Sequence, residues 1–173
     1  MEISTIDPFL EYYSRVRERT RRVAQLIPEE RLEWTYLPGK FTLGDLVRHI
    51  AAIERWLYAE NVMRRPSRYS GCGRELADGK EAVLQYLDEM NRQSVEIFSR
   101  ITPENLHSKI LTPTGQPITC WKWLRLLPEH EIHHRGQIYL YLNQLGILTP
   151  PLYGLTSEEV KERSQPQLPE NEY

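Results

Sequence analysis

Three of the five histidines in this chain lie on the apolar faces of predicted helices. His130 and His134 are four residues apart, and this spacing places two side chains on one helix face with Cβ atoms about 6 Å apart. His49 lies on the apolar face of an earlier helix. Imidazoles from facing helices can hold one metal ion in a bundle core and leave positions open for water or substrate. The sequence therefore predicts one divalent metal ion bound by His49, His130 and His134.

The alternative for each histidine is an ordinary core or surface position. For His49 alone, a core histidine with a satisfied hydrogen bond is the simpler interpretation. For His130 and His134 together this interpretation is weaker, because two imidazoles in an apolar core are costly when nothing binds them. His133 lies at the flank of the same face, about 100° around the helix from His134, where it could contact a substrate. His107 lies in a predicted linker and is expected at the surface.

The segment from His130 to His134 also matches H-E-x-x-H, the zinc-protease motif in which the glutamate is a general base. Proteases of this kind hold the peptide at a sheet edge and take a third ligand further along the chain. Strand signals are weak here, and the downstream candidates Glu158 and Glu159 fall in the tail. The protease interpretation is therefore disfavoured.

Half of a di-iron bundle signature is also present, as Glu131 and His134. The second Glu-x-x-His pair, Glu104 and His107, stands outside any strong helix. Glu60 is the one further inward glutamate that the pattern offers, whereas a di-iron site needs two more. A mononuclear site fits the sequence better.

Three residues near the histidines are candidates for catalysis, namely Glu131, His133 and Gln137. Gln137 lies near the same helix face and could hydrogen-bond a metal-bound water. Glu131 and Asp45 could accept hydrogen bonds from ligand imidazoles, as carboxylates near metal sites often do. Each of these residues is also compatible with an ordinary helix surface.

Proline placement predicts the helices that must position these residues. The 12 prolines leave four long proline-free runs, which matter because interior proline breaks or kinks a helix. Apolar residues recur in these runs at intervals of three and four. The pattern predicts helices over residues 8–27, 42–63, 80–101 and 119–145. Pro128 is expected to kink the last of them, and a short helix is expected over residues 157–163.

Capping residues set the expected ends of these helices. Asp7 and Asp78 are expected as N-caps of the first and third helices. Thr42 and Asp45 are expected to form a capping box at the start of the second helix. Gly146 is expected just past the end of the fourth, where glycine is usual.

Four long amphipathic helices predict an all-α fold, a four-helix bundle built from a single domain over residues 1–173. The linkers between helices 1 and 2 and between helices 3 and 4 are long and are expected to cover one end of the bundle. Short β-like segments at residues 32–37 and 109–112 have no convincing partner. Residues 165–173 are polar and contain proline, and we expect them to form a mobile tail.

Composition limits the functional classes. Lys and Arg number 22 against 24 Asp and Glu, and the net charge of -2 over 173 residues disfavours nucleic-acid binding. No apolar run is long enough for a transmembrane helix, and the first residues lack the pattern of a signal peptide. Cys72, expected in an exposed loop, and Cys120, expected as a structural residue, are too few for a disulfide framework. The expected location is the cytoplasm, with no membrane partner.

Two helix faces carry further expectations. The first helix is expected to turn a solvated face of arginines outward; these are Arg15, Arg17, Arg19, Arg21 and Arg22. On the last helix, Trp121, Ile132 and Tyr139 share the face opposite the histidines. A helix that is apolar on two faces is buried twice or forms an interface, so we expect a homodimer contact there or burial under a linker.

The histidine blocks resemble those of the DinB-like family of damage-inducible helical-bundle proteins, which also includes thiol-dependent transferases. The later block, HEIHHRGQ, spans residues 130–137. The earlier block, FTLGDL over residues 41–46, leads into His49. The tail segment over residues 150–156, PPLYGLT, is also similar to tails in the family. The resemblance covers about residues 5–160.

This resemblance implies a four-helix bundle that binds one divalent ion, commonly zinc or nickel, through three histidines. The positions that match the family pattern are His49, His130 and His134. It also implies frequent homodimers. Some members of the family act with a low-molecular-weight thiol.

A metal ion held by three neutral imidazoles keeps its positive charge and an open position. It can lower the pKa of a bound water towards 7, or hold a thiol as the reactive thiolate. The first functional hypothesis is therefore metal-assisted transfer of a small thiol onto an electrophilic small molecule. Two alternatives stay open: a non-catalytic metal-binding stress-response protein, and a metal-dependent hydrolase.

Overall fold

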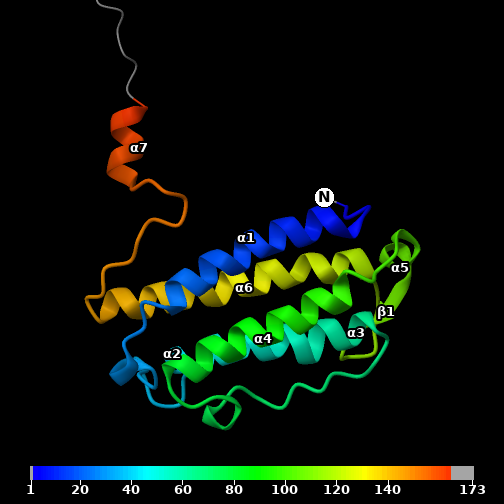
Figure 1. The fold of residues 1–173 in the computed structure, drawn as a ribbon, viewed down its shortest axis with the longest axis horizontal. Coiled ribbons are helices and arrows are strands. Elements are labelled where there is room, and N and C mark those ends of the chain that lie inside the picture. Colours follow the sequence, from blue (N-terminus) through cyan, green and yellow to red (C-terminus); the bar gives the residue numbers. More distant parts are fainter. Residues whose placement is uncertain (1, 165–173) are drawn as a thin grey trace, which may run out of the picture.

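Four long helical segments lie side by side in the computed structural model, which describes residues 2–164 (Figure 1). They are α1 (Ile6–Ala24), α2 (Leu43–Ile53) with its continuations η2 (Glu54–Ala59) and α3 (Glu60–Val62), α4 (Lys80–Phe98) and α6 (Cys120–Gln144). The predicted all-α four-helix bundle is confirmed. The expected mobile tail, residues 165–173, lies outside the described residues.

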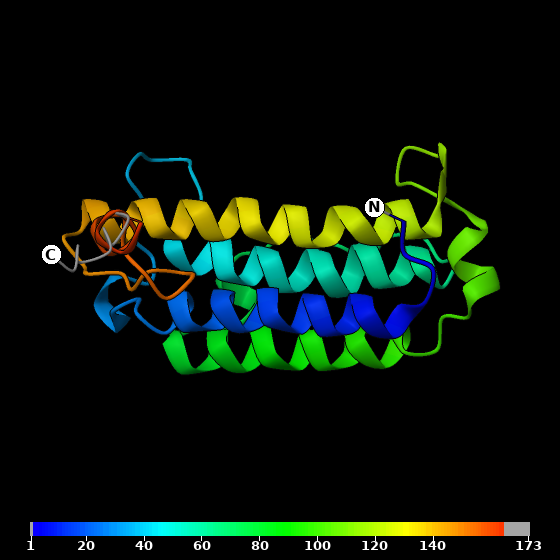
Figure 2. The ribbon, with the colours of Figure 1, turned by 90° about the horizontal axis from the view of Figure 1, so that it is seen from above.

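The helices do not alternate up and down around the bundle. α1 packs against α4 and α6, and α2 packs against the same two helices. α1 and α6 run in one direction, whereas α2 and α4 run in the other (Figures 1 and 2). Because the neighbours α2 and α4 are parallel, the chain between them, residues 63–79, must return along α2 before α4 can begin. The helical periodicity does not indicate this crossover.

The other two connections cover opposite ends of the bundle, not the same end as expected, because the crossover reverses the direction of α4. Residues 25–42, with the 3₁₀ turn η1 (Glu29–Arg31), lie at one end, and residues 99–119 lie at the other (Figure 1). The second connection holds α5 (Pro103–His107). It also holds a small antiparallel sheet.

The sheet in the second connection pairs β1 (Lys109–Leu111) with β2 (Pro117–Thr119), and Ile110 stands opposite Ile118. The expectation that the β-like segment at 109–112 lacks a partner is therefore wrong. The other β-like segment, 32–37, forms no strand. Which segment pairs with a strand depends on the path of the chain. The partner here, β2, has only three residues, which are too few to be recognised as a strand by their pattern alone.

Two of the predicted caps are present. At the start of α2, the backbone N–H of Asp45 donates to Thr42 Oγ1, and the N–H of Thr42 donates to Asp45 Oδ2, both at 3.0 Å. After α6, Gly146 has φ +71°, and the N–H of Ile147 donates to the carbonyl of Leu142 at 2.9 Å. This hydrogen bond and the left-handed glycine form the Schellman motif that ends many helices.

The other two predicted caps are wrong. α1 begins at Ile6 after an extended Thr5, so Asp7 lies inside the first turn. There its negative charge still interacts favourably with the positive end of the helix dipole. α4 begins at Lys80 after Gly79, which has φ +86°. Asp78 instead pairs with Arg74 at 2.8 Å, within the crossover that holds the 3₁₀ turn η3 (Arg74–Leu76).

A π-helical segment, η2, interrupts the long helix that the sequence predicts over residues 42–63. On a regular α-helix, residues nine apart such as His49 and Tyr58 lie on opposite faces, because each residue turns the chain by about 100°. The wider π turns bring them closer to one face. As a result Tyr58 is buried, whereas the apolar residues Trp56 and Leu57 stay partly exposed.

Two apolar clusters fill the bundle, one toward each end. The first contains Phe9, Tyr58, Phe98 and Leu124 among others. The second contains Ile27, Leu46, Leu87, Ile138 and Leu142 among others. The apolar residues that recur at intervals of three and four along α1 contribute to both clusters, which confirms that this face of α1 points inward.

A buried polar layer lies at the middle of the bundle. The guanidinium of Arg17 contacts the carboxylates of Glu54 and of Glu131, the latter at 2.9 Å, and donates to Tyr13 Oη at 2.8 Å. Arg17 is only 5% exposed, so its expected place on a solvated face is wrong. It follows Tyr13 by four residues and therefore shares the inward face of α1.

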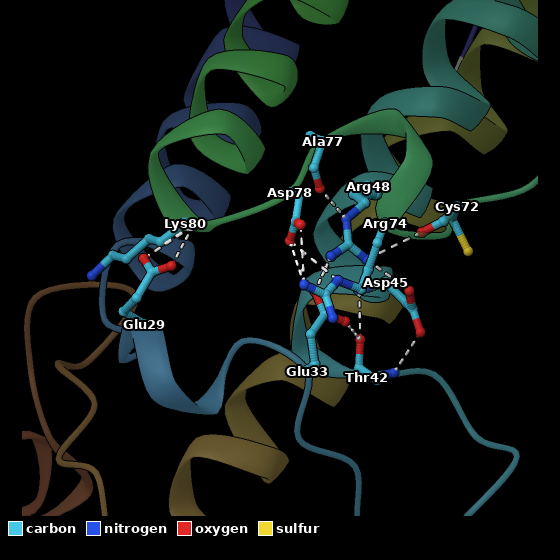
Figure 3. A network of polar contacts seen from close by, with 10 residues as sticks. All are labelled: Glu29, Glu33, Thr42, Asp45, Arg48, Cys72, Arg74, Ala77, Asp78 and Lys80. Atoms are coloured by element: carbon cyan, nitrogen blue, oxygen red, sulfur yellow. Dashed lines mark hydrogen bonds and ion pairs between the residues drawn. The ribbon is translucent and has the colours of Figure 1, made fainter.

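Arg48, at 0% exposure, ties the crossover to the start of α2 (Figure 3). Its Nε donates to the carbonyl of Ala77 at 2.9 Å, and its Nη1 donates to Asp45 Oδ1 at 2.8 Å and to the carbonyl of Cys72 at 3.4 Å. Its Nη2 pairs with Glu33. Cys72 is buried here, so its expected place in an exposed loop is wrong; burial also raises the pKa of its thiol.

The second apolar face of α6 is only partly covered. The Tyr139 hydroxyl donates to the carbonyl of Pro150, so the chain after α6 covers this end of the face. Trp121 packs against the first apolar cluster. Ile132 stays 38% exposed. The homodimer contact at this face stays a prediction.

The predicted short helix in the tail is confirmed as α7 (Ser157–Arg163), which starts with a capping box between Thr156 and Glu159. It stands apart from the bundle in Figure 1. Among the helices of residues 2–164, none combines the length and the apolar character that crossing a bilayer requires.

Replacing Arg17 by methionine should destabilise the fold strongly, because Glu54 and Glu131 would keep their burial and lose their cation. Breaking a buried pair in this way costs about 3–5 kcal/mol. Arg15→Met is the matched control, because Arg15 is exposed on the same helix and within residues 2–164 pairs only with Glu11. Its effect should stay below about 0.5 kcal/mol. Equal effects in urea unfolding at pH 8 would contradict this assignment.

The loss of stability caused by Arg17→Met should depend on pH in a direction that the pKa of Glu54 fixes. Burial raises the pKa of Glu54 to about 7, from 4.5. The folded protein therefore binds more protons than the unfolded chain between these values, and the stability contribution of Glu54 falls as pH rises through about 7. Losing Arg17 raises this pKa further. The destabilisation should thus be larger at pH 8 than at pH 5.5.

Candidate metal centre

The three predicted ligands come together between α2 and α6. One nitrogen from each of His49, His130 and His134 lies within 4.8 Å of the other two, and His49 Nε2 lies 3.1 Å from His130 Nε2. A tetrahedral zinc ion with bonds of about 2.0–2.1 Å holds its nitrogens about 3.3 Å apart. The spacing of the imidazoles therefore fits a single ion of this size.

Hydrogen bonds orient two of the three rings. His134 Nδ1 lies 2.8 Å from Gln137 Oε1, and His49 Nδ1 lies 2.8 Å from the hydroxyl of Tyr69. An amide oxygen only accepts, so Nδ1 of His134 carries the proton and its Nε2 keeps a lone pair. Such partners fix the ring and the tautomer of metal-binding histidines.

Burial keeps the imidazoles neutral. Burial, together with the smaller effect of the neighbouring histidines, lowers the pKa of His49 to about 4 and the pKa of His130 to about 3. Burial also lowers the pKa of His134. Neutral imidazole is the form that binds a metal ion, so at pH 7 protons compete little for these three nitrogens.

Aromatic rings surround the histidines. The ring centroid of Phe41 lies 5.2 Å from that of His49 and 6.4 Å from that of His134. Tyr58 lies 6.3 Å from His130 by the same measure. These rings make part of the surroundings of the imidazoles apolar, and polar interactions are stronger in an apolar environment.

Tyr69 is a site residue that the sequence did not reveal. It lies in the crossover, and its contact with His49 exists only because the crossover returns along α2 and is tied there by Arg48 (Figure 3). No helical period extends into this segment. A tyrosine in a linker carries no signal of such a role.

The three catalytic candidates lie in different places relative to the histidine cluster. Gln137 lies at the site, where it bonds His134 and also contacts His133 Nε2 at 3.3 Å. His133 is exposed at the mouth of the site. Glu131 points instead into the bundle and pairs with Arg17, so its expected contact with a ligand imidazole is wrong. One residue turns a helix by about 100°, which separates Glu131 from its neighbour His130.

The remaining acidic candidates also lie elsewhere. Asp45 is used by the cap of α2 and by Arg48, so its expected contact with His49 is wrong. Glu60 pairs with Arg55 at 2.6 Å. Across residues 2–164, the group of histidines, cysteines and carboxylates that is close enough to share an ion contains only imidazoles. This donor set fits a mononuclear site and not a di-iron site.

The last two polar candidates are not part of the site. His107 is exposed, as expected, and contacts Glu2 and the carbonyl of Pro103. Cys120 is buried, and burial raises the pKa of its thiol to about 11. A thiol with such a pKa is not a nucleophile at neutral pH.

Comparison with known proteins identifies the relatives of this fold. A sequence model described as the DinB superfamily matches residues 12–138. The Bacillus subtilis protein YjoA is 28% identical over 142 residues, which cover 79% of this chain and 88% of YjoA.

Solved structures share the fold. A DinB-like protein from Bacillus cereus superposes with a TM-score of 0.73 at 22% identity and covers 86% of this chain and 97% of its own. YfiT from Bacillus subtilis, described as a probable metal-dependent hydrolase with an unusual four-helix bundle topology, gives a TM-score of 0.68 at 16% identity. The match covers 86% of this chain and 91% of YfiT.

Elemental analysis of the purified protein should find about one divalent ion per chain. His134→Ala should lose it, because two imidazoles remain where three are needed. His107→Ala is the matched control, since His107 is exposed and outside the site, and it should keep the ion. Protein that takes up no zinc or nickel after stripping and reloading would contradict the site.

Acid should destabilise the metal-free protein through the same imidazoles. Their folded pKa values lie below the unfolded value of 6.5, so between pH 6.5 and 4 the unfolded chain binds more protons and stability falls as pH falls. His130→Asn should reduce this slope by up to about one proton, whereas His107→Asn should not. The measurement is urea unfolding at several pH values with a chelator present.

Proposed function

The chain belongs to the DinB superfamily, and from its three-histidine cluster we propose that it is a metal-dependent enzyme that transfers a small thiol onto an electrophilic small molecule. His49, His130 and His134 would hold the ion. When bound, a divalent ion with three neutral imidazoles supplies Lewis acidity that lowers the pKa of a bound thiol or water. Zinc and nickel are the proposed metals.

The observation that carries this proposal is the absence of a carboxylate beside the histidines in the described part of the chain. Hydrolysis at a metal centre commonly uses a glutamate or aspartate as general base. Here Glu131 is held in the core by Arg17. A thiol is acidic enough to lose its proton near a cation without such a base. Thiol transfer therefore does not require the carboxylate that hydrolysis commonly uses.

The chain's own side chains would orient and shield the reacting molecules. Tyr69 and Gln137 fix the rings of His49 and His134. Phe41 and Tyr58 provide an apolar wall against which an electrophile can pack. His133, at the exposed edge, can contact the polar part of a substrate.

Metal-dependent hydrolysis is the second candidate, because the related fold of YfiT is described as that of a probable metal-dependent hydrolase. In this chain a hydrolytic reaction would have to use His133 or Tyr69 for proton transfer, since Glu131 is not available. A non-catalytic metal-binding role in the stress response is the third.

The test measures conjugation of monochlorobimane with cysteine or glutathione by the zinc- or nickel-loaded protein. We expect metal-dependent conjugation that His134→Ala and a chelator abolish. Tyr69→Phe should lower the rate or the metal affinity by about tenfold, because it removes only the partner of one ligand. Arg92→Gln, an exposed change on α4, is the control and should change neither.

The same samples separate the three functions. Metal-dependent hydrolysis of p-nitrophenyl acetate without any thiol requirement would contradict thiol transfer and support the second candidate. Stoichiometric metal with neither activity would support the non-catalytic role.

A further inference from the structure

A pocket lies at one end of the bundle, away from the histidines. It has a volume of about 630 Å³, which is within the usual range for small-molecule sites. The end of α3, the first residues of the crossover and the β1–β2 hairpin form its walls. Its polar lining consists of Asn61, Arg64, Arg65, Ser67, Lys109 and Thr112.

The lining is cationic and has no acidic residue. Within residues 2–164, none of Arg64, Arg65 and Lys109 forms an ion pair; Arg64 donates to Ser108 Oγ and Lys109 to Thr119 Oγ1, both at 3.0 Å. Many other arginines of the chain have a carboxylate partner, as Arg92 has Glu89. Three cations without acidic partners around one hollow attract an anion.

Asn61 adds a buried group that lacks a partner. The residue is 5% exposed, and its Nδ2 donates to the carbonyl of Arg65 at 3.3 Å. Its Oδ1 is buried and accepts no hydrogen bond from the described residues. A buried acceptor without a donor is unfavourable, and this one belongs to a residue of the pocket wall. A ligand with an N–H or O–H group would satisfy it.

Arg64 is held in a conformation that normally selects glycine. Its φ is +60°, and it ends α3 in a Schellman motif, with the N–H of Arg65 donating to the carbonyl of Glu60 at 2.9 Å. The same motif ends α6, where the corresponding residue is Gly146. A side chain in this conformation is strained. Glycine at this position would avoid the strain, but only arginine adds a guanidinium to the lining of the pocket.

We propose that this pocket binds a small organic anion, a molecule with a phosphate or carboxylate group and a neighbouring N–H or O–H donor. The cations Arg64, Arg65 and Lys109 would contact the anionic group, and Asn61 Oδ1 would accept from the donor. Asn61 follows His49 by 12 residues on one continuous helical segment, which corresponds to roughly 18 Å. The site is therefore separate from the histidine cluster and does not depend on the proposed thiol transfer.

The experiment titrates isotope-labelled protein with glucose 6-phosphate, malate and inorganic phosphate, followed by amide chemical shifts. We expect saturable shifts confined to residues 61–67 and 109–115. Glucose 6-phosphate binding tighter than malate would assign the anionic group as phosphate, and the reverse order would assign it as carboxylate. Inorganic phosphate lacks the neighbouring donor group and should bind more weakly than the better organic probe.

Variants test the named contacts. Arg64→Gly should weaken binding of the better probe about tenfold and should not lower the melting temperature, because glycine relieves the strained φ. Lys109→Gln should weaken binding to a similar degree. Arg92→Gln is the matched control and should bind as the wild type does.

The metal site provides the second control. His130→Ala should bind the anion with unchanged affinity. Loss of anion binding in His130→Ala would place the probe at the histidines and overturn the proposal. Shifts outside the pocket, no saturation by any probe, or wild-type affinity in Arg64→Gly would also overturn it. None of these results bears on whether the histidines bind metal.

Discussion

The contact of Arg17 with Glu54 and Glu131 sets the arrangement on which the rest of the protein depends. It joins α1, η2 and α6 at the middle of the bundle, between two apolar clusters. A buried cation must meet its counter-charges, so the contact fixes how α6 is rotated about its axis. With Glu131 turned toward α1, the adjacent His130 and the nearby His134 turn toward α2, where His49 completes the cluster. Glu131, which resembles a catalytic base by its position in a motif, thus acts as a structural anchor of the candidate metal centre.

The parallel direction of α2 and α4 has consequences at both candidate sites. It forces the crossover to return along α2, and Arg48 ties this segment down with carbonyl and carboxylate contacts. The returning chain carries Tyr69 to His49. The exposed Arg64 and Arg65, which follow α3 at the start of the crossover, lie with the β-hairpin around the cationic pocket. One topological feature therefore supplies a hydrogen-bond partner for His49 and a wall of the cationic pocket.

The two sites differ in electrostatic character for physical reasons. The imidazoles are surrounded by aromatic rings, and burial keeps them neutral, which suits coordination of a cation. The pocket beyond Asn61 has exposed cations without acidic partners in the described chain, which suits an anion. The separation along the same helical segment means that a metal ion at the histidines and an anion in the pocket would not compete directly through their charges.

The sequence by itself determined the features that depend on neighbours within one helix. The four-residue spacing of His130 and His134, the capping box at Thr42 and the left-handed glycine after α6 follow from local geometry, because a helix repeats every 3.6 residues whatever packs against it. The three candidate ligands and the four-helix fold were predictable on this basis. Only the tertiary structure decided what depends on the partner of each face: that Arg17 is buried, that Glu131 serves the core, that η2 turns Tyr58 inward, and that a linker tyrosine supports His49. These outcomes depend on contacts between segments far apart in the chain, which periodicity along one helix does not encode.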